Sequence, residues 1–360
     1  MLVLFRIVFS LLLLSVFNLS AQQCRGVNDS PPVRALYFSP ETDNHSFWGM
    51  QREYMKAVAR NLNIELTLVE IKPDQENSFA FIDLIHSKLR EGIKPDIILG
   101  IFYLNGEMEF LEYVESEKIP FFSVNVSLPA LNAKKVGKPR ENFPHWIGHM
   151  APNDENAGYQ LALDLIDQQS SPPVMMSLSG DAESSVAYNR ATGANRVSKE
   201  KGVHVLPLIN TNWSNQQGYS ATKQVYRHFP NVNIIWTAGP GLARGALEFL
   251  RDSSLDKKSI QIGTFDWSVD VLNLLIKKEI DISFGGHFRE AGWALILAYD
   301  YFSGIDFKTD IGLSIETQLQ QATHHNARSL LTNVQQNWLK TDFRKFSKCL
   351  NSSLKTYNFN

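Results

Sequence analysis

Aromatic and polar side chains follow several of the short apolar runs in this 360-residue sequence. In a sheet of parallel strands, the residues just beyond the carboxyl ends of the strands form the ligand-binding edge. We select as candidates Asp43, His45, Phe47, Trp48, Asn125, Arg190, Trp213, Asp266 and His287. Aromatic rings cover the C–H faces of a ligand, and planar polar groups pair with its hydroxyls. The set therefore suits a small polyhydroxylated ligand.

The same positions offer no nucleophile paired with a base, and the sequence has no Gly-x-Ser-x-Gly elbow. His145 and His149 stand four residues apart in an extended segment, which separates them by roughly 13 Å and argues against a shared metal. The segment Gly239–Gly245 resembles a dinucleotide-binding loop, but Pro240 removes an amide that such a loop offers to phosphate. We therefore expect a binding protein, not an enzyme, without a metal or cofactor.

Short apolar runs alternate with longer amphipathic ones from Val33 onward, which predicts strands alternating with helices. The expected strands are 33–39, 64–71, 96–100, 120–125, 146–148, 174–178, 203–209, 233–237, 260–265 and 280–284. The expected helices are 47–62, 79–90, 154–169, 186–201, 215–229, 241–252, 267–278 and 290–303. This order predicts an α/β fold with parallel sheets flanked by helices. So many units exceed one sheet, and the stretch Leu128–Pro144, rich in Pro, Lys, Gly and Asn, is interpreted as the seam between two domains.

The composition is that of a globular protein with a sizeable core. Apolar residues make up 44% of the chain and charged residues 20%, which excludes global disorder. Lys and Arg number 35 against 37 Asp and Glu, with no basic block. Nucleic acid, which requires a concentrated positive surface, is therefore not an expected partner.

The N-terminal segment 1–21 has the features of a secretory signal peptide. Arg6 precedes the apolar run Ile7–Phe17, and small residues close the segment at Ser20 and Ala21. The run is too short to span a bilayer comfortably, although an uncleaved anchor is the alternative. In an exported protein, Cys24 and Cys349 would either form a disulfide that ties the two ends of the chain together or remain two unpaired thiols.

Several motifs stand in an order that resembles the type I periplasmic binding proteins, the ribose- and galactose-binding group, and among them the periplasmic autoinducer-2 receptors. The resemblance runs from about Val33 to Gly304. Its specificity comes from the linear order of the motifs, which are Asn44–Trp48, Asn125, Ser184–Gly193, Trp213 before Gly218-Tyr219, His228–Ile235, Gly245–Leu247 and Gly263–Asp266.

The resemblance implies two lobes, each a parallel sheet flanked by helices, with the ligand in the cleft between them. We expect an N-lobe of 33–128 plus 287–308 and a C-lobe of 145–286 plus 309–348. The chain would cross between the lobes near 127–130, 148–152 and 283–287.

The function implied is that of a periplasmic solute-binding protein. It would be a monomer that captures a sugar or sugar-like signal and presents it to an inner-membrane ABC permease or a membrane sensor. Two departures concern the ligand contacts: Gly239-Pro240 stands where the family usually carries a polar pair, and Gly286-His287 where Gln or Arg is common. The alternative from another class is an exported α/β hydrolase acting on a small carbohydrate or ester.

Each polar candidate also has an interpretation without a ligand. Arg190 could form a salt bridge on a solvated helix face, and Asp266 could cap the helix that follows it. Asn125 could close a turn at the end of its strand.

The aromatic candidates could equally be packing residues. Phe47 and Trp48 could belong to the core of the first helix, and Trp213 could pack within its loop. Trp236 and Trp293, in the middle of a predicted strand and a predicted helix, are expected to be core residues.

Overall fold

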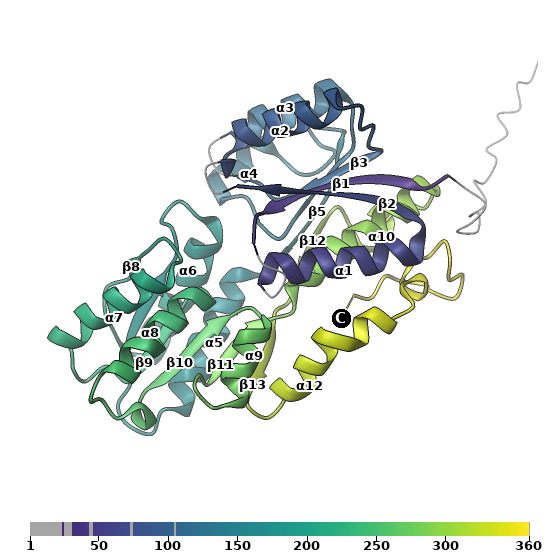
Figure 1. Cartoon of the computed structure of the whole chain (residues 1–360). Coiled ribbons are helices and arrows are strands. Elements are labelled where there is room, and N and C mark those ends of the chain that lie inside the picture. The colour runs from purple at the N-terminus through teal and green to yellow at the C-terminus, as the bar shows by residue number, and fades with distance from the viewer. Residues whose placement is uncertain (1–23, 25–30, 43–45, 73–74, 104–105, 360) are drawn as a thin grey trace, which may run out of the picture.

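The computed structural model describes residues 24, 31–42, 46–72, 75–103 and 106–359. Two sheets flanked by helices form two lobes, with the blue and purple elements of the first lobe above the green ones of the second in Figure 1. This confirms the predicted two-lobed α/β fold. Over the described part of the chain, no helix has the length and apolar character needed to cross a membrane.

The first sheet is six-stranded and parallel, in the order β12-β5-β4-β3-β1-β2. Its strands are β1 (Val33–Pro40), β2 (Ile64–Ile71), β3 (Ile97–Gly100), β4 (Phe121–Val124), β5 (Trp146–Pro152) and β12 (Ser314–Thr317). The helices of this lobe are α1 (Phe47–Leu62), α2 (Ser78–Arg90), α3 (Glu107–Glu117), α4 (Ala130–Val136), α10 (Glu290–Phe302) and α11 (Lys308–Ile311). The central strands β3 and β4 are buried throughout because helices cover both faces of the sheet.

The second sheet is seven-stranded, in the order β13-β11-β10-β9-β6-β7, with β8 also beside β6. Its strands are β6 (Val174–Ser179), β7 (His204–Val205), β8 (Ile209–Asn210), β9 (Ile234–Thr237), β10 (Gln261–Phe265), β11 (Ile282–Gly285) and β13 (Gln320–Thr323). The α-helices of this lobe are α5 (Asp154–Gln168), α6 (Ser185–Lys201), α7 (Asn215–His228), α8 (Pro240–Asp252), α9 (Val269–Ile276) and α12 (Ala327–Thr332). Only β13, which pairs with β11, is antiparallel among its described ladders.

The strand pairing differs from the expected lobe boundaries of 145 and 309. Strand β5 pairs with β4, and β12 pairs with β5, so both belong to the first sheet. The stretch Leu128–Pro144 connects β4 to β5 within that sheet and contains α4, so the seam predicted there is wrong. A run rich in Pro, Gly and Lys marks a surface connection, which is as common inside a lobe as between lobes.

The chain crosses between the sheets at three places. It leaves the first sheet after β5, returns between β11 and α10, and leaves again between β12 and β13. The crossings expected near 148–152 and 283–287 agree with this path. The crossing expected near 127–130 is wrong, and the third crossing lies instead between Thr317 and Gln320.

Several elements differ from the expected pattern, which has no counterpart of α3, α4, α11, α12, β12 or β13. Helix α3 was not expected, although Phe110, Leu111 and Val114 bury one face of it at helical spacing. The strand expected at 203–209 is divided into β7 and β8, with Pro207 between them. Proline lacks the N–H that a continuous strand would donate.

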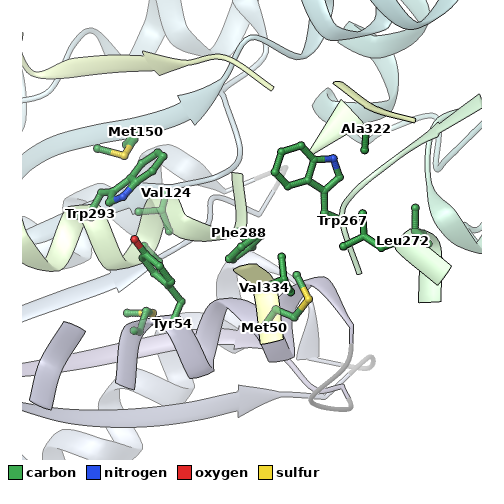
Figure 2. Close-up of a cluster of buried hydrophobic side chains, with 14 of the residues drawn as sticks. Met50, Tyr54, Val124, Met150, Trp267, Leu272, Phe288, Trp293, Ala322 and Val334 are labelled. Carbon is green, nitrogen blue, oxygen red and sulfur yellow. The ribbon is translucent and has the colours of Figure 1, made fainter. Parts of the chain in front are cut away.

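One buried cluster of apolar side chains joins the lobes beneath the crossings. Figure 2 shows Tyr54, Phe288 and Trp293 packed with Val124 of the first lobe. The cluster continues to Trp267 of the second lobe. Trp293 is 6% exposed and Trp236 is 0% exposed, which confirms both as core residues.

The C-terminal segment 333–359 runs from the second lobe back to the first. Helix α12 packs on α9, and the segment then lies along α1, where the Phe343 ring is 5.2 Å from that of Tyr54. Buried Asp300 accepts hydrogen bonds from the Ser347 hydroxyl, the Lys348 amide and the Tyr357 hydroxyl. The last part of the chain is thus anchored to α10.

The two cysteines meet at this anchored segment. The signal peptide predicted at 1–21 lies outside the described residues, but Cys24 is described. Both cysteines are free thiols in the structure, so the predicted disulfide is not formed there. Burial and a hydrogen bond with the Cys24 thiol raise the pKa of Cys349 to about 12. The ends of the chain are therefore adjacent, and their oxidation to a disulfide stays a prediction.

Candidate ligand-binding cleft

A cleft of about 800 Å³ opens between the carboxyl ends of the two sheets. Of the nine candidates, Asp43 and His45 lie outside the described residues. All the others line the cleft, and they are Phe47, Trp48, Asn125, Arg190, Trp213, Asp266 and His287. The strand-end rule brought them together because parallel strands of one sheet end at the same edge.

Three of these residues have an uncommon backbone conformation. The φ angles of Asn125, Trp213 and Asp266 are 63°, 67° and 71°. These values lie in the left-handed region, which residues other than glycine rarely adopt. Asn125 and Asp266 come directly after β4 and β10, and Trp213 stands just before α7. Strained residues of this kind gather at ligand-binding sites, where the surrounding fold holds them in place.

Arg190 lies on the floor of the cleft, not on a solvated helix face. It is 4% exposed, and its Nε donates to Asp154 Oδ1 at 2.7 Å while Nη1 donates to the carbonyl of Ala238 at 2.8 Å. The guanidinium carbon lies 4.2 Å from the centre of the Phe265 ring. The salt bridge interpretation is thus correct, but the bridge is buried. The described residues accept from Nε and Nη1, which leaves Nη2 for a ligand.

Asp266 and His287 lie side by side next to Arg190. His287 Nε2 is 3.4 Å from Asp266 Oδ1. Burial raises the pKa of Asp266 to about 6, with nearby Arg190 opposing the shift and Asp154 adding to it. Burial lowers the pKa of His287, so its ring is neutral. Within the described structure, His287 Nδ1 and Asp154 Oδ2 are buried without a hydrogen-bond partner. We call Arg190, Asp266 and His287, together with Asp154, which pairs with Arg190 but does not itself line the cleft, the cleft floor.

Asp266 does not cap the helix that follows it, so the alternative to a ligand role is wrong for this residue. Helix α9 is capped by Ser268, whose hydroxyl accepts from the Val271 amide at 3.3 Å. The Asp266 side chain is therefore available to the cleft.

Asn125 lines the cleft, but its amide is engaged elsewhere. Nδ2 donates to the His287 carbonyl at 3.0 Å and to Glu290 Oε2 at 2.6 Å, which uses both of its hydrogens. Its Oδ1 accepts from Gln51, and the other Glu290 oxygen accepts from Thr317. Burial raises the pKa of Glu290 well above its usual value. We call Asn125, Gln51, Glu290 and Thr317 the hinge network, because Glu290 and Thr317 adjoin two of the crossings.

The aromatic candidates surround the cleft floor. The Phe47 ring is 4.5 Å from the His287 ring and 4.8 Å from that of Trp48, both measured between ring centres. Ser46 caps α1 by accepting from the Gly49 amide, which places Phe47 and Trp48 in the first turn.

Trp213 both packs in its loop and lines the cleft, so the two interpretations of this residue are compatible. A Cβ on Gly180 would come within 1.9 Å of its ring, and one on Gly239 within 3.1 Å. Gly239 therefore makes room for the ring of Trp213.

Some lining residues were not among the candidates. Ile101, Phe102 and Tyr103 directly follow β3, so the strand-end rule would have found them had it been applied to that strand. The Tyr103 hydroxyl is buried without a partner among the described residues. Glu76 and Asn77 line the cleft just before α2, where no strand-end signal exists. Ser184 and Ser185 also line the cleft. They lie in the Ser184–Gly193 motif, from which only Arg190 was a candidate.

Two lobes with three crossings and a lined cleft between strand ends define a type I periplasmic binding protein fold. A family model described as periplasmic binding protein domain matches residues 36–304, and the chain belongs to that family. A search of curated protein sequences finds no match.

Solved structures agree on the fold. A periplasmic sugar-binding protein from Pseudomonas fluorescens is 23% identical, with 88% of this chain and 94% of that chain covered and a TM-score of 0.76. A solute-binding protein from Actinobacillus succinogenes with bound D-allose is 15% identical, with coverage of 83% and 99% and a TM-score of 0.72. A periplasmic ribose ABC transporter protein from Conexibacter woesei is 14% identical, with coverage of 87% and 98% and a TM-score of 0.70.

Proposed function

We propose that this protein captures a small polyhydroxylated ligand, a sugar or sugar-like signal, in the cleft between its lobes. The observation that carries the proposal is the cleft floor, where the side chains of Arg190, Asp266 and His287 line one cleft and offer a guanidinium beside a carboxyl. A guanidinium pairs well with vicinal oxygens, and a carboxylate accepts from hydroxyls. Structural neighbours named for allose, ribose and other sugars support this ligand class.

The other candidates would act around this polar floor. The rings of Phe47, Trp48 and Trp213 would cover the C–H faces of the ligand. Asn125 would act through the hinge network rather than by donating to the ligand. Asp43 and His45 remain predicted contacts.

The lobes would close over the ligand by motion about the crossings. They already touch at one rim of the cleft, where the Ser185 hydroxyl of α6 donates to the Ser127 carbonyl at 2.7 Å. Closure would bring the floor groups and the aromatic side chains onto opposite faces of one ligand.

Membership of the family supports a periplasmic location, reached through the signal peptide expected at 1–21. There the protein would act as a monomer and present its ligand to an inner-membrane ABC permease or a membrane sensor. Genes for a permease and an ATPase next to this one would favour transport, whereas a sensor kinase gene would favour signalling. No observation favours the hydrolase alternative, since the family and the named neighbours are binding proteins.

Calorimetry with D-ribose, D-allose and L-arabinose tests the ligand class directly. X-ray scattering with the tightest of these sugars then tests closure. We expect a smaller radius of gyration at saturation, and identical curves would contradict the closure.

A further inference from the structure

The two walls of the cleft have different chemistry. The wall from the first lobe is built from apolar and aromatic residues that follow β1, β3 and β4 or begin α1, notably Trp48, Ile101, Phe102 and Val126. The facing wall from the second lobe carries Asp181, Ser184, Ser185, Arg190 and Asp266.

In the described part of the first-lobe wall, few polar groups are free to contact a ligand. The amide hydrogens of Asn125 are both used in the hinge network. Glu76 and Asn77 are exposed, at the rim of the cleft. The Tyr103 hydroxyl remains, as a single polar group amid apolar side chains.

This apolar wall is closely packed. Phe102 is 3% exposed, and its ring is held by those of Phe121 and Trp146 at 5.7 and 5.4 Å between ring centres. Ile101 is 6% exposed beside it. A wall so tightly packed cannot rearrange to offer polar groups, so a ligand hydroxyl pressed against it would lose its hydrogen bonds to water without replacement.

We infer that the ligand of this cleft is amphipathic: a deoxygenated or alkyl-substituted sugar whose apolar part lies against Ile101 and Phe102 and whose hydroxyls meet the cleft floor. The inference rests on the proposed function and narrows its ligand class. Sugars with hydroxyls on every carbon would bind more weakly. An apolar pocket disfavours an added hydroxyl by roughly a hundredfold at most. We therefore expect the deoxygenated sugar to bind roughly tenfold tighter, or more, than the parent sugar.

Calorimetry with matched pairs tests this preference, using D-galactose against 6-deoxy-D-galactose and D-allose against 6-deoxy-D-allose, because the loss of a 6-hydroxyl leaves the pyranose ring intact. We expect the deoxy sugar to bind tighter in the pair with the stronger affinity. Tighter binding of the parent sugar in both pairs would overturn the inference while leaving the proposed function intact. Failure of all four sugars to bind at millimolar concentration would contradict the proposed function itself.

A variant pair shows whether the wall is the cause. Ile101→Asn, at the cleft end of β3, should shift the ratio of the two Kd values at least tenfold toward the parent sugar. Ile93→Asn is the control, because Ile93 precedes β3 at the opposite end of the strand and lines a different surface groove. Trp48→Gln is a second test variant, since half-buried Trp48 can be replaced without a core cavity. Unchanged ratios in both test variants would overturn the assignment of the preference to this wall.

Discussion

The cleft floor and the hinge network lie next to each other, and both bury charged or titratable groups. They differ in how completely those groups are hydrogen-bonded. In the hinge network, Glu290 accepts from Thr317 and Asn125, and Asn125 in turn accepts from Gln51. In the cleft floor, Asp154 Oδ2 and His287 Nδ1 are buried without a partner in the described chain.

This difference separates a structural role from a ligand-binding role. A buried polar atom without a partner costs about 1–3 kcal/mol, so it persists where something else repays the cost. A ligand can hydrogen-bond to Arg190 and Asp266, which line the cleft, whereas the hinge network is complete without one. Substitutions in the first region should therefore change affinity, with or without a change in stability, whereas those in the second should act mainly on stability.

The largest expected effect is on Arg190. Arg190→Ala should weaken binding of the tightest sugar by about 2–5 kcal/mol, because a desolvated charged partner is lost and Asp154 is left unpaired. Arg190→Lys keeps the charge but not the fork that pairs with two oxygens, and should recover only part of the affinity. Calorimetry measures both, and equal affinity of Arg190→Ala and the native protein would remove Arg190 from the site.

Glu290 should show the opposite behaviour. Glu290→Ala leaves Thr317 and Asn125 unpaired in the interior, so the free energy of unfolding should fall by about 2–4 kcal/mol. Glu290→Gln has nearly the same shape and should cost less, because burial raises the pKa of Glu290 and so already disfavours the charged carboxylate. Urea unfolding gives the comparison. A native-like stability for Glu290→Ala would show that the network does not hold the crossings.

Trp48→Ala should weaken binding by about 2 kcal/mol, the usual effect of removing a buried aromatic contact from a binding site. Stability should change little, because the side chain is only half-buried without a ligand. Calorimetry and a thermal melt on the same sample separate the two effects. A large drop in Tm would mean that the ring is a core residue of α1.

The smallest expected effect is a dependence of affinity on pH. The pKa of Asp266 is raised to about 6, so this carboxyl is ionised at pH 7 and becomes protonated as the pH falls through 6. Protonation removes an acceptor for ligand hydroxyls, and affinity should fall about tenfold, or 1.4 kcal/mol, between pH 7 and pH 5. Asp266→Asn should bind weakly with little change over this range. A native protein with constant affinity from pH 7 to 5 would argue against contact between Asp266 and the ligand.

The same raised pKa of Asp266 also makes the stability of the protein decrease as the pH rises. Because the folded state holds this proton more tightly than the unfolded state, the contribution of Asp266 is favourable below pH 3.8 and is lost between pH 3.8 and about 6. Asp266→Asn should therefore be more stable than the native protein at pH 7.

Local patterns in the sequence sufficed for most elements of the fold. Helix α1 runs from Phe47 to Leu62 as its apolar spacing predicts. Arg190 and Asp266 were predicted as cleft residues because they follow strands, and both line the cleft. Tyr103 follows the end of β3 in the same way, so its place in the cleft could also be predicted from the sequence.

The pairing of segments that are distant in the sequence could not be predicted from local patterns. Nothing local in Trp146–Pro152 shows that it joins β4 rather than the second sheet, because the hydrogen bonds that decide it come from distant residues. The partners of the Asn125 amide, Gln51 and Glu290, are distant in the same way. The position of Asn125 could be predicted, but not the direction in which its amide donates.

Mass spectrometry of the ligand released on denaturation tests the central claim most directly. The native protein and Arg190→Ala would be purified in parallel from cells producing each. The cleft floor predicts a polyhydroxylated compound released from the native protein and depleted in Arg190→Ala. Equal release of that compound from both proteins, or a released compound that lacks hydroxyl groups, would contradict the account.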